Sequence, residues 1–538
     1  MFTSLSSRRR LALAATTALA ALAAGPALAQ ESASDADLRA QVRQLSALVQ
    51  SLAQKDQAQI QALQAQVQAL QAKLDAQGAV ATNAGAQTAT PRVAQNAPSF
   101  PSGGGTGAVA EAGFATPRVS QNETQHFTLI SPDGQYSIGF AGVVQMDAGS
   151  YFNFKPQSKY VGTQTLSDGV NARRARIGVS GTAAGGWSYA FLYDGGNSQD
   201  TTAKGIETAQ IVYGGIKGMA FEFGYSNTQF TLDQSTSGND LVFLERASPS
   251  DIATAYNTGD FRSNAGVRFF SDWYWLGGYL TGPAAGDSHT NVGERLGAFE
   301  RATFQVLHGK DYSLHLGVGG SELLRAPNTG TGTARTLSLS DQPELRIDPT
   351  TFLNTGTIGT AKNPVSGGYV IDLETAATYH GWLWQGEYYH YDVDRTGLAS
   401  NTFDGYYGQV AYTLTGETHR YNPQSGAYYR IFPTHSFSLK DGTWGAWEIG
   451  GRYSYIDLND NFVTGQSLSS QPDAILGGKQ TGWTFGLNWY PNDIVRFMLD
   501  YNHVDYHKVN GTAVTGAPLG APVGATLDMI SLRSQVVF

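Results

Sequence analysis

Hydrophobic and polar residues alternate along the last part of the chain, most clearly between Trp483 and Phe538. Apolar side chains occupy every second position before the turn Tyr490-Pro491-Asn492-Asp493, and the alternation resumes from Val495 to Tyr501. A period of two on both sides of a Pro-Asn-Asp turn predicts a β-hairpin. Aromatic residues near both ends of arms about long enough to cross a bilayer are typical of a transmembrane β-barrel.

Further alternating segments, separated by turns, begin at Tyr136. They include Arg174–Ser180, Trp187–Tyr193, Met219–Tyr225, Ala265–Phe269, Trp273–Tyr279, Ala302–Val306, Tyr312–Val318, Tyr369–Tyr379, Trp382–Tyr391, Tyr406–Leu414 and Trp447–Tyr455. With the closing strands they predict an all-β transmembrane barrel of about 16 antiparallel strands, an even number as bacterial barrels have. The long polar segments Asn153–Asn171, Ser226–Asp260, Gly320–Gly368 and Thr415–Gly442 are expected on the outer side, opposite the short turns.

The number of strands bears on function, because barrels of about eight strands are filled by side chains whereas those of about 16–18 leave an aqueous channel. Charged residues are costly on the lipid face, so the register that turns them inward is preferred. The residues expected to face the lumen are Arg174, Arg176, Arg268, Arg301, His315, Glu448, Arg452, Asn488, Arg496, Asp500 and Arg533. The arginines would either guide anions or pair with acids such as Glu448, Asp500 and Glu222.

The N-terminus carries a secretory signal. Three arginines, at positions 8–10, precede an apolar run from Leu11 to Ala24, and Ala27-Leu28-Ala29 is a small-residue cleavage site. This pattern predicts a signal peptide over residues 1–29, cut after Ala29. An anchor helix is the alternative, but the run is short for one.

Residues 30–77 predict a coiled coil. Apolar residues step by four and three in two series, Leu38, Val42, Leu45, Val49 and Leu52, then Ile60, Leu63, Val67, Leu70 and Leu74. A solvated monomeric helix or disorder is the alternative. Residues 78–125 predict a flexible Ala/Gly/Pro/Thr linker, which contains the direct repeat ATPRVAQN and ATPRVSQN. The barrel domain is expected over residues 126–538.

Composition narrows the possible functions. Charged residues make up only 15% of the chain, below the usual quarter or so. There is no cysteine, so thiolate chemistry is excluded. The formal net charge of −9 makes the chain a poor nucleic-acid binder.

Five segments together resemble one family, the phosphate-selective porins O and P of Gram-negative outer membranes. They are ARRARIGVSG (Ala172–Gly181), LVFLERASP (Leu241–Pro249), GAWEIGGRYSYIDLND (Gly445–Asp460), GGKQTGWTFGLNWYPND (Gly477–Asp493) and the terminal SLRSQVVF. The resemblance implies a trimer of sixteen-stranded barrels, in which a long loop folds inward and arginines and lysines guide anions. By position, Ser226–Asp260 corresponds to that loop, and Arg173, Arg174 and Arg176 match the family's Arg-rich second strand.

The sequence departs from the family pattern in the inward loop. Members tend to carry a lysine-containing GQFKEPF-like stretch where this chain has GYSNTQFTLD (Gly224–Asp233). The loop holds one basic residue, Arg246, against five acidic ones, whereas a tight phosphate site needs several donors with little competing negative charge. The porin assignment is therefore better founded than phosphate selectivity.

We therefore expect an outer-membrane porin whose water-filled channel passes small anions, phosphate included, and polar solutes. The predicted pore-lining residues are Arg174, Arg176, Arg246, Arg268, Arg301, Arg452 and Arg496. Outer-membrane lipids and a homotrimer are the expected partners, with no cofactor, metal or nucleic acid. The alternative is an envelope tether, in which a periplasmic coiled coil reaches toward the cell wall and the pore is secondary.

An enzyme is not expected. No GxSxG-type elbow or clustered catalytic set occurs. His503 and His507 lie four residues apart on a predicted strand, which separates them by about 13 Å, too far for one metal ion. The aromatic group Trp382, Trp384, Tyr388 and Tyr389 is expected in a membrane-interface girdle, and a sugar-binding platform is the alternative.

Overall fold

The computed structural model describes residues 118–120, 127–161, 166–196, 205–256, 259–284, 293–328, 334–463, 466, 468–511 and 517–538. The chain divides after Ala94 into two compact units, and every described residue belongs to the second. The predicted signal peptide, the coiled coil and most of the linker lie outside the described residues. No described helix has the length and hydropathy of a membrane span.

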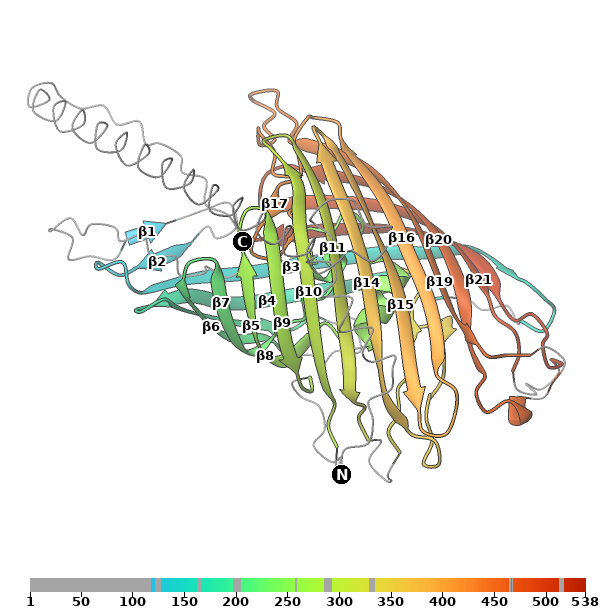
Figure 1. The fold of residues 1–538 in the computed structure, drawn as a ribbon. Coiled ribbons are helices and arrows are strands. Elements are labelled where there is room, and N and C mark those ends of the chain that lie inside the picture. Colours follow the sequence, from blue (N-terminus) through green and yellow to red (C-terminus); the bar gives the residue numbers. More distant parts are fainter. Residues whose placement is uncertain are drawn as a thin grey trace, which may run out of the picture. The chain divides into compact units, whose positions relative to one another are not determined.

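Sixteen antiparallel strands close into a barrel (Figure 1), and the pairing of the last strand with the first completes the cylinder. They are β3 (Ser137–Pro156), β4 (Gly169–Ala183), β5 (Trp187–Asp194), β6 (Gly205–Ile216), β7 (Met219–Asn227), β8 (Phe261–Phe270), β9 (Tyr274–Thr281), β10 (Leu296–His308), β11 (Tyr312–Arg325), β14 (Val365–Tyr379), β15 (Trp382–Arg395), β16 (Asn401–Thr413), β19 (Ala446–Asp460), β20 (Ile475–Tyr490), β21 (Val495–His507) and β22 (Ala525–Val537). The predicted barrel of about 16 strands is confirmed.

Several shorter elements are not part of the barrel wall. β1 (Arg118–Ser120) pairs with β2 (Thr128–Ile130), which extends the sheet next to β3, so the end of the segment expected to be a flexible linker is strand. The connections contain α3 (Leu232–Ser235), α4 (Ser248–Tyr256), β12 (Ser340–Asp341), β13 (Leu353–Asn354), β17 (Tyr421–Asn422), β18 (Ala427–Tyr428) and the 3₁₀ turn η1 (Leu468–Ser470).

The alternating pattern places apolar residues outside and polar residues inside, as predicted. On β20 the side chain of Phe485 is 55% exposed, whereas Thr484 and Asn488 are 1% and 0% exposed. On β21 the inward Arg496 and Asp500 are buried in the same way. The outward side chains would face lipid, which costs an apolar side chain nothing.

Two of the β-bulges in the described wall bury charged residues. Gln145 pairs with Arg174 and Met146 pairs with Ala172, so Arg173 is the extra residue and both arginines are buried. A similar bulge at Glu207 buries Glu207 and Thr208 side by side in β6. The period of two is lost there, which explains why β6 was not among the segments singled out from the sequence.

The two ends of the barrel differ. Connections of two to four residues join the strands at the end where the chain enters β3 and leaves β22, and most long loops lie at the other end. Residues 414–445 are the exception, because they join β16 to β19 at the turn end, where Phe437 N donates to Pro491 O. The prediction that Thr415–Gly442 lies with the outer loops was wrong. Since short turns face the periplasm, residues 414–445 form a long periplasmic connection.

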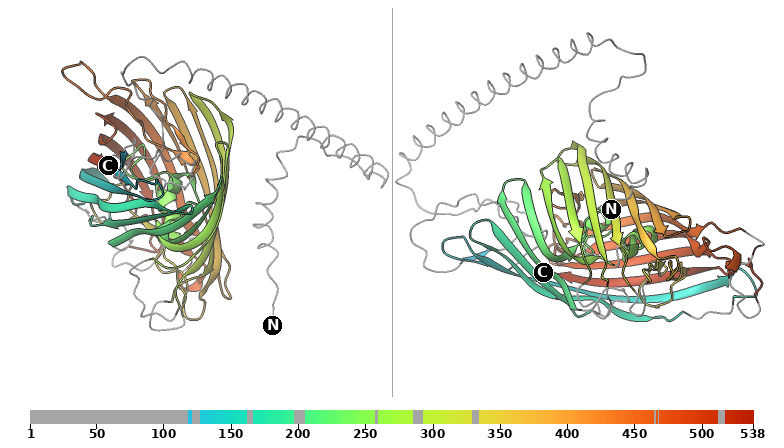
Figure 2. Two further views of the ribbon diagram at one scale, coloured as in Figure 1. Left: turned by 90° about the vertical axis from the view of Figure 1, so that its left-hand side faces the viewer. Right: turned by 60° about the horizontal axis from the view of Figure 1, so that its bottom comes forward.

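The wall is not equally high all round. β5 and β9 have eight residues each and β7 has nine, whereas β19 and β20 have 15 and 16. Figure 2 shows the short and long sides of the cylinder. A transmembrane strand needs about 9–11 residues, so β5, β7 and β9 barely span a bilayer. Together with β6 and β8, of 12 and ten residues, they form the low wall.

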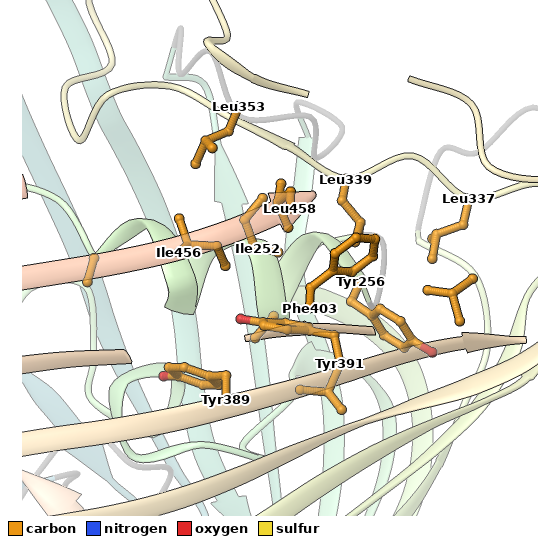
Figure 3. Packing of buried hydrophobic residues seen from close by; sticks show 14 of the residues in the cluster. Ile252, Tyr256, Leu337, Leu339, Leu353, Tyr389, Tyr391, Phe403, Ile456 and Leu458 are labelled. Carbon is orange, nitrogen blue, oxygen red and sulfur yellow. The ribbon is translucent and has the colours of Figure 1, made fainter. Parts of the chain in front are cut away.

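An apolar core fills part of the barrel interior (Figure 3). It joins Ile252 and Tyr256 of α4 to Leu337, Leu339 and Leu353 of the β11–β14 loop (residues 326–364), and to wall residues Tyr389, Tyr391, Phe403, Ile456 and Leu458. All of these side chains are buried. Tyr389 therefore faces inward, and its predicted place in the outer girdle was wrong, whereas Trp382, Trp384 and Tyr388 are exposed on the outer face.

Candidate permeation pathway

The constriction loop, residues 228–260, lies inside the barrel between β7 and β8. Thr231 caps its first helix, α3, by accepting a hydrogen bond from Gln234 N. The backbone amides of Leu232 and Asp233, at the start of this helix, donate to the carboxylate of Glu387 on the wall, at 2.7 and 3.0 Å. The start of the loop is thus fixed by a wall carboxylate that satisfies a helix N-terminus.

Glu245 anchors the middle of the constriction loop. Arg173 donates to both carboxylate oxygens at 2.7 and 2.9 Å, and Arg533 of β22 donates to Oε1 at 2.8 Å. Burial raises the pKa of Glu245, but Arg173 and Arg533 reverse this and hold the pKa well below its usual range. Glu245 is therefore ionised at neutral pH.

Glu344 links the β11–β14 loop to the constriction loop and to the wall. Its carboxylate accepts from Arg452 at 2.6 Å, from Ser454 at 2.6 Å and from Ser248 N at 3.1 Å. The backbone of Glu344 has a φ of 50°, in the left-handed region that non-glycine residues rarely adopt. The contacts of the side chain offset that local strain.

The turn-end hairpin, defined here as residues 414–445, enters the barrel from the opposite mouth. Arg301 on β10 meets it by donating to Ser425 O and Gly426 O, both at 2.8 Å. The same guanidinium pairs with Glu374 at 3.0 Å and donates to Ser235 of α3 at 2.8 Å. One side chain therefore joins the wall, the constriction loop and the hairpin.

A cavity of about 260 Å³ remains beside these loops, against β3–β8. The basic residues in its lining are Arg174, Arg176, Arg246 and Arg268, and the acidic residues are Glu207, Glu222, Asp240 and Asp260. Ser235, Ser237 and Asn239 of the constriction loop and Asn422, Ser425 and Tyr428 of the hairpin complete the polar surface. The cavity thus carries equal numbers of basic and acidic side chains.

Four of the seven arginines predicted to line the pore reach this cavity, and three do not. Arg301 is held by Glu374 and the hairpin, and Arg452 pairs with Glu344 over the ring of Phe243. Arg496 donates to backbone oxygens of the constriction loop and lies over Tyr490. All three side chains face inward as predicted but hold loops in place.

Most of the cavity arginines are paired with acids. Arg268 lies 3.1 Å from Glu222, as the sequence suggested, and Arg246 lies 3.1 Å from Asp233. Arg176 pairs with Asp194 at 2.9 Å and also with Glu207. The other two acids suggested as arginine partners are Glu448 and Asp500. Glu448 pairs with His419, and Asp500 accepts a hydrogen bond from Leu244 N.

Arg174 differs from the other three. Its Nη1 donates to the amide oxygen of Gln145 at 2.7 Å, and no carboxylate of the described residues lies within ion-pair distance. Its side chain is 5% exposed and its Nε has no hydrogen-bond partner among these residues. A guanidinium without an ion-pair partner among the described residues therefore borders the cavity.

Sequence reasoning missed the acids and the hairpin that shape this pathway. Glu344 lies in a long loop without any pattern, and nothing in the sequence marks it as an anchor. Glu245 was visible in the LERA segment, but was counted only as competing negative charge. His503 and His507 each bind an acid instead of sharing a ligand, Asp528 at 2.7 Å and Asp505 at 3.1 Å.

The family model for phosphate-selective porin O and P matches residues 144–538, most of the chain. The chain belongs to this family. Porin O of Pseudomonas aeruginosa is 25% identical over 395 residues, which cover 70% of this chain and 85% of that protein. An uncharacterized protein of Caulobacter vibrioides is 28% identical over 384 residues, 69% of each chain.

Solved outer-membrane proteins are similar to this chain at low sequence identity. The anion-selective porin from Comamonas acidovorans covers 75% of this porin with 12% identity and a TM-score of 0.43, and all of that chain is matched. The channel DcaP of Acinetobacter baumannii also covers 75%, with 12% identity and a TM-score of 0.40, and 98% of that chain is matched. This porin is an outer-membrane channel protein of the Gram-negative type.

Proposed function

We propose that this porin passes small anions and small polar solutes by passive diffusion, with a weak preference for anions and without a tight phosphate site. The proposal rests on Arg174, the cavity-lining guanidinium that no described carboxylate pairs with. A permeating anion can accept a hydrogen bond from it without displacing a protein acid.

The remaining charges argue for weak selectivity. Arg176, Arg246 and Arg268 are each held by a carboxylate, and the cavity counts four basic against four acidic residues. A multiply charged anion would have to compete with those carboxylates for donors. Chloride-sized or singly charged solutes therefore fit better than tightly bound phosphate.

The low wall supports assembly into a homotrimer. Strands of eight or nine residues leave the apolar band of about 25 Å incompletely covered, so lipid would contact polar loop ends there. Packing β5–β9 against a neighbouring copy removes that mismatch. Crosslinking of cysteines placed on the outer face of β5–β9 tests this arrangement, and monomers alone at every position would contradict it.

The experiment for selectivity is a reversal-potential measurement on single channels in a KCl gradient. Arg174→Gln is expected to shift the reversal potential toward cation preference. Lys440→Gln is the matched control, because Lys440 is exposed on the turn-end hairpin and does not line the cavity. An unchanged reversal potential in Arg174→Gln would remove the assigned role, and purified protein without stepwise current would overturn the channel itself.

Adding phosphate to the chloride solution tests the second half of the proposal. Weak binding predicts that chloride current falls only when phosphate is comparable in concentration to chloride. Strong block by trace phosphate would instead show a tight site. The comparisons support the channel, and none of them supports the envelope tether.

A further inference from the structure

Three buried carboxylates meet on the inner face of the wall, beneath the start of the constriction loop. Glu374 on β14 pairs in register with Glu387 on β15, and Asp372 lies two residues from Glu374 on the same face. One oxygen of each residue lies within 4.8 Å of the others. We call these three residues the acid cluster.

Two members of the acid cluster already accept hydrogen bonds. Glu374 accepts from Arg301 and His315, and Glu387 accepts from two backbone amides of the constriction loop and from the hydroxyl of Tyr407. These donors fix the two carboxylates in place, and each glutamate still presents one oxygen to the cluster.

Asp372 is different, because it is fully buried and no basic or neutral group of the described residues donates to either of its oxygens; its side chain meets only the carboxyl group of Glu387. It is also aimed at the other two carboxylates, as the distances within the cluster show. A buried carboxylate without any donor is costly unless a proton or a cation compensates it. Arg301 and His315 contact Glu374 and do not contact Asp372.

We propose that the acid cluster binds a divalent cation, with Ca²⁺ as the best match. All ligand atoms are carboxylate oxygens, which calcium and magnesium prefer over nitrogen or sulfur. Oxygens that share a calcium ion at about 2.4 Å lie at most about 4.8 Å apart, in agreement with the spacing of the cluster. Calcium tolerates irregular geometry, and water would complete its shell, whereas Mg²⁺ needs a near-ideal octahedron at shorter distances.

The position of this ion gives it a structural consequence. Glu387 holds the first turn of the constriction loop, and Glu374 holds Arg301, which in turn binds the turn-end hairpin. An ion between these glutamates would brace both inward segments from the wall. The proposal does not depend on which solute crosses the channel.

The test uses the full-length porin in detergent, treated with a chelator, desalted and titrated with Tb³⁺, with emission excited through tyrosine. Tyr407 donates to Glu387 and is therefore close enough to sensitise the bound ion. The expected result is saturable emission that Ca²⁺ displaces and that Tyr407→Phe weakens. Elemental analysis after dialysis against calcium should find one more bound calcium ion per chain than in the chelator-treated porin.

Asp372→Asn removes the uncompensated carboxylate while keeping its shape, and should weaken Tb³⁺ and Ca²⁺ binding at least about tenfold. Asp404→Asn is the matched control on the neighbouring β16, because Asp404 is exposed on the outer face and should leave binding unchanged. Absence of saturable binding in the wild type overturns the proposal, and so does equal binding in Asp372→Asn. If Asp372→Asn does not fold, Glu387→Gln and the elemental analysis of the wild type decide in the same way.

Discussion

Arg173 and Glu245 form a two-pronged ion pair, in which Nε and Nη2 donate to separate carboxylate oxygens at 2.7 and 2.9 Å. The pair joins the second barrel strand to the middle of the constriction loop. Arg533, from the last strand, shares the same carboxylate. The position of the constriction is thus determined by the second and last strands of the barrel, which lie on either side of the first strand.

Glu245→Gln is expected to raise anion preference. The substitution removes one buried negative charge while Arg173 and Arg533 stay ionised, so the interior becomes more positive by one charge. If the electrostatic energy of a permeating ion changes by about 0.5–1 kcal/mol, the anion-to-cation permeability ratio rises roughly two- to fivefold. Reversal potentials measure this ratio, with the exposed Asp441→Asn of the turn-end hairpin as control. A fall in the ratio would contradict the prediction.

Arg301→Met should loosen both inward segments at once. It leaves Glu374 buried with a lost partner, and removing one member of such a pair costs about 3–5 kcal/mol. Arg301→Lys keeps the charge but lacks the planar fork that reaches Ser235, Ser425 and Gly426 together. Both variants should show larger, noisier single-channel currents and faster hydrogen exchange in residues 414–445. Wild-type currents in both would show that the hairpin is held by other contacts.

Phe538 closes the barrel over Gly142. The two residues exchange backbone hydrogen bonds at 2.7 and 3.0 Å, and a Cβ on Gly142 would lie 2.3 Å from the ring of Phe538. Gly142→Leu should therefore reduce the yield of folded barrel, measured as heat-modifiable mobility on a gel. Phe538→Ala in the same chain should restore part of the yield, because it removes the clashing ring. If the double variant folds no better than Gly142→Leu, the clash is not the cause.

The contact between α4 and the β11–β14 loop should strengthen as the solution becomes more acidic. Asp341 and Asp251 share Arg346. Burial raises the pKa of Asp341 to about 6, although Arg346 acts in the opposite direction, and burial raises the pKa of Asp251 as well. The pKa of Asp341 is therefore higher when α4 packs against the β11–β14 loop than when this contact is broken. The packed state binds the proton more tightly, so protonation favours the contact.

The stability of this contact should therefore be larger below about pH 6 and decline as the pH rises through that value. For Asp341 alone the gain from about pH 7 to about pH 5 is on the order of 1 kcal/mol. Hydrogen exchange in residues 334–364, corrected for its intrinsic pH dependence, measures it. Asp341→Asn should abolish most of the change, because Asp251 then has Arg346 to itself. A contact that weakens on acidification would contradict the assignment.

The sequence predicted the wall well and the interior poorly, for a physical reason. Alternation follows from the pleat, so Arg496 and Asp500 could be placed inside without knowing any partner. The bulge at Arg173 could not be seen, because it depends on how two strands are matched. The acids that hold the loops, such as Glu344, depend on long-range packing that leaves no periodic trace.

The periplasmic position of residues 414–445 follows from the order of the strands. Each strand reverses the direction of the chain, and three strands, β14, β15 and β16, separate residues 326–364 from residues 414–445. An odd number of crossings places these two connections at opposite ends. Counting crossings, instead of loop length, would have assigned the turn-end hairpin to the periplasmic side.

Arg430 of the turn-end hairpin and Asp240 of the constriction loop lie 2.8 Å apart, although their segments enter the barrel through opposite mouths. The two segments can meet only inside a closed barrel, because the wall strands carry them in from opposite ends. The formation of this ion pair therefore marks the completion of biogenesis: a crosslink between these positions would trap only molecules whose β-sheet has finished assembling.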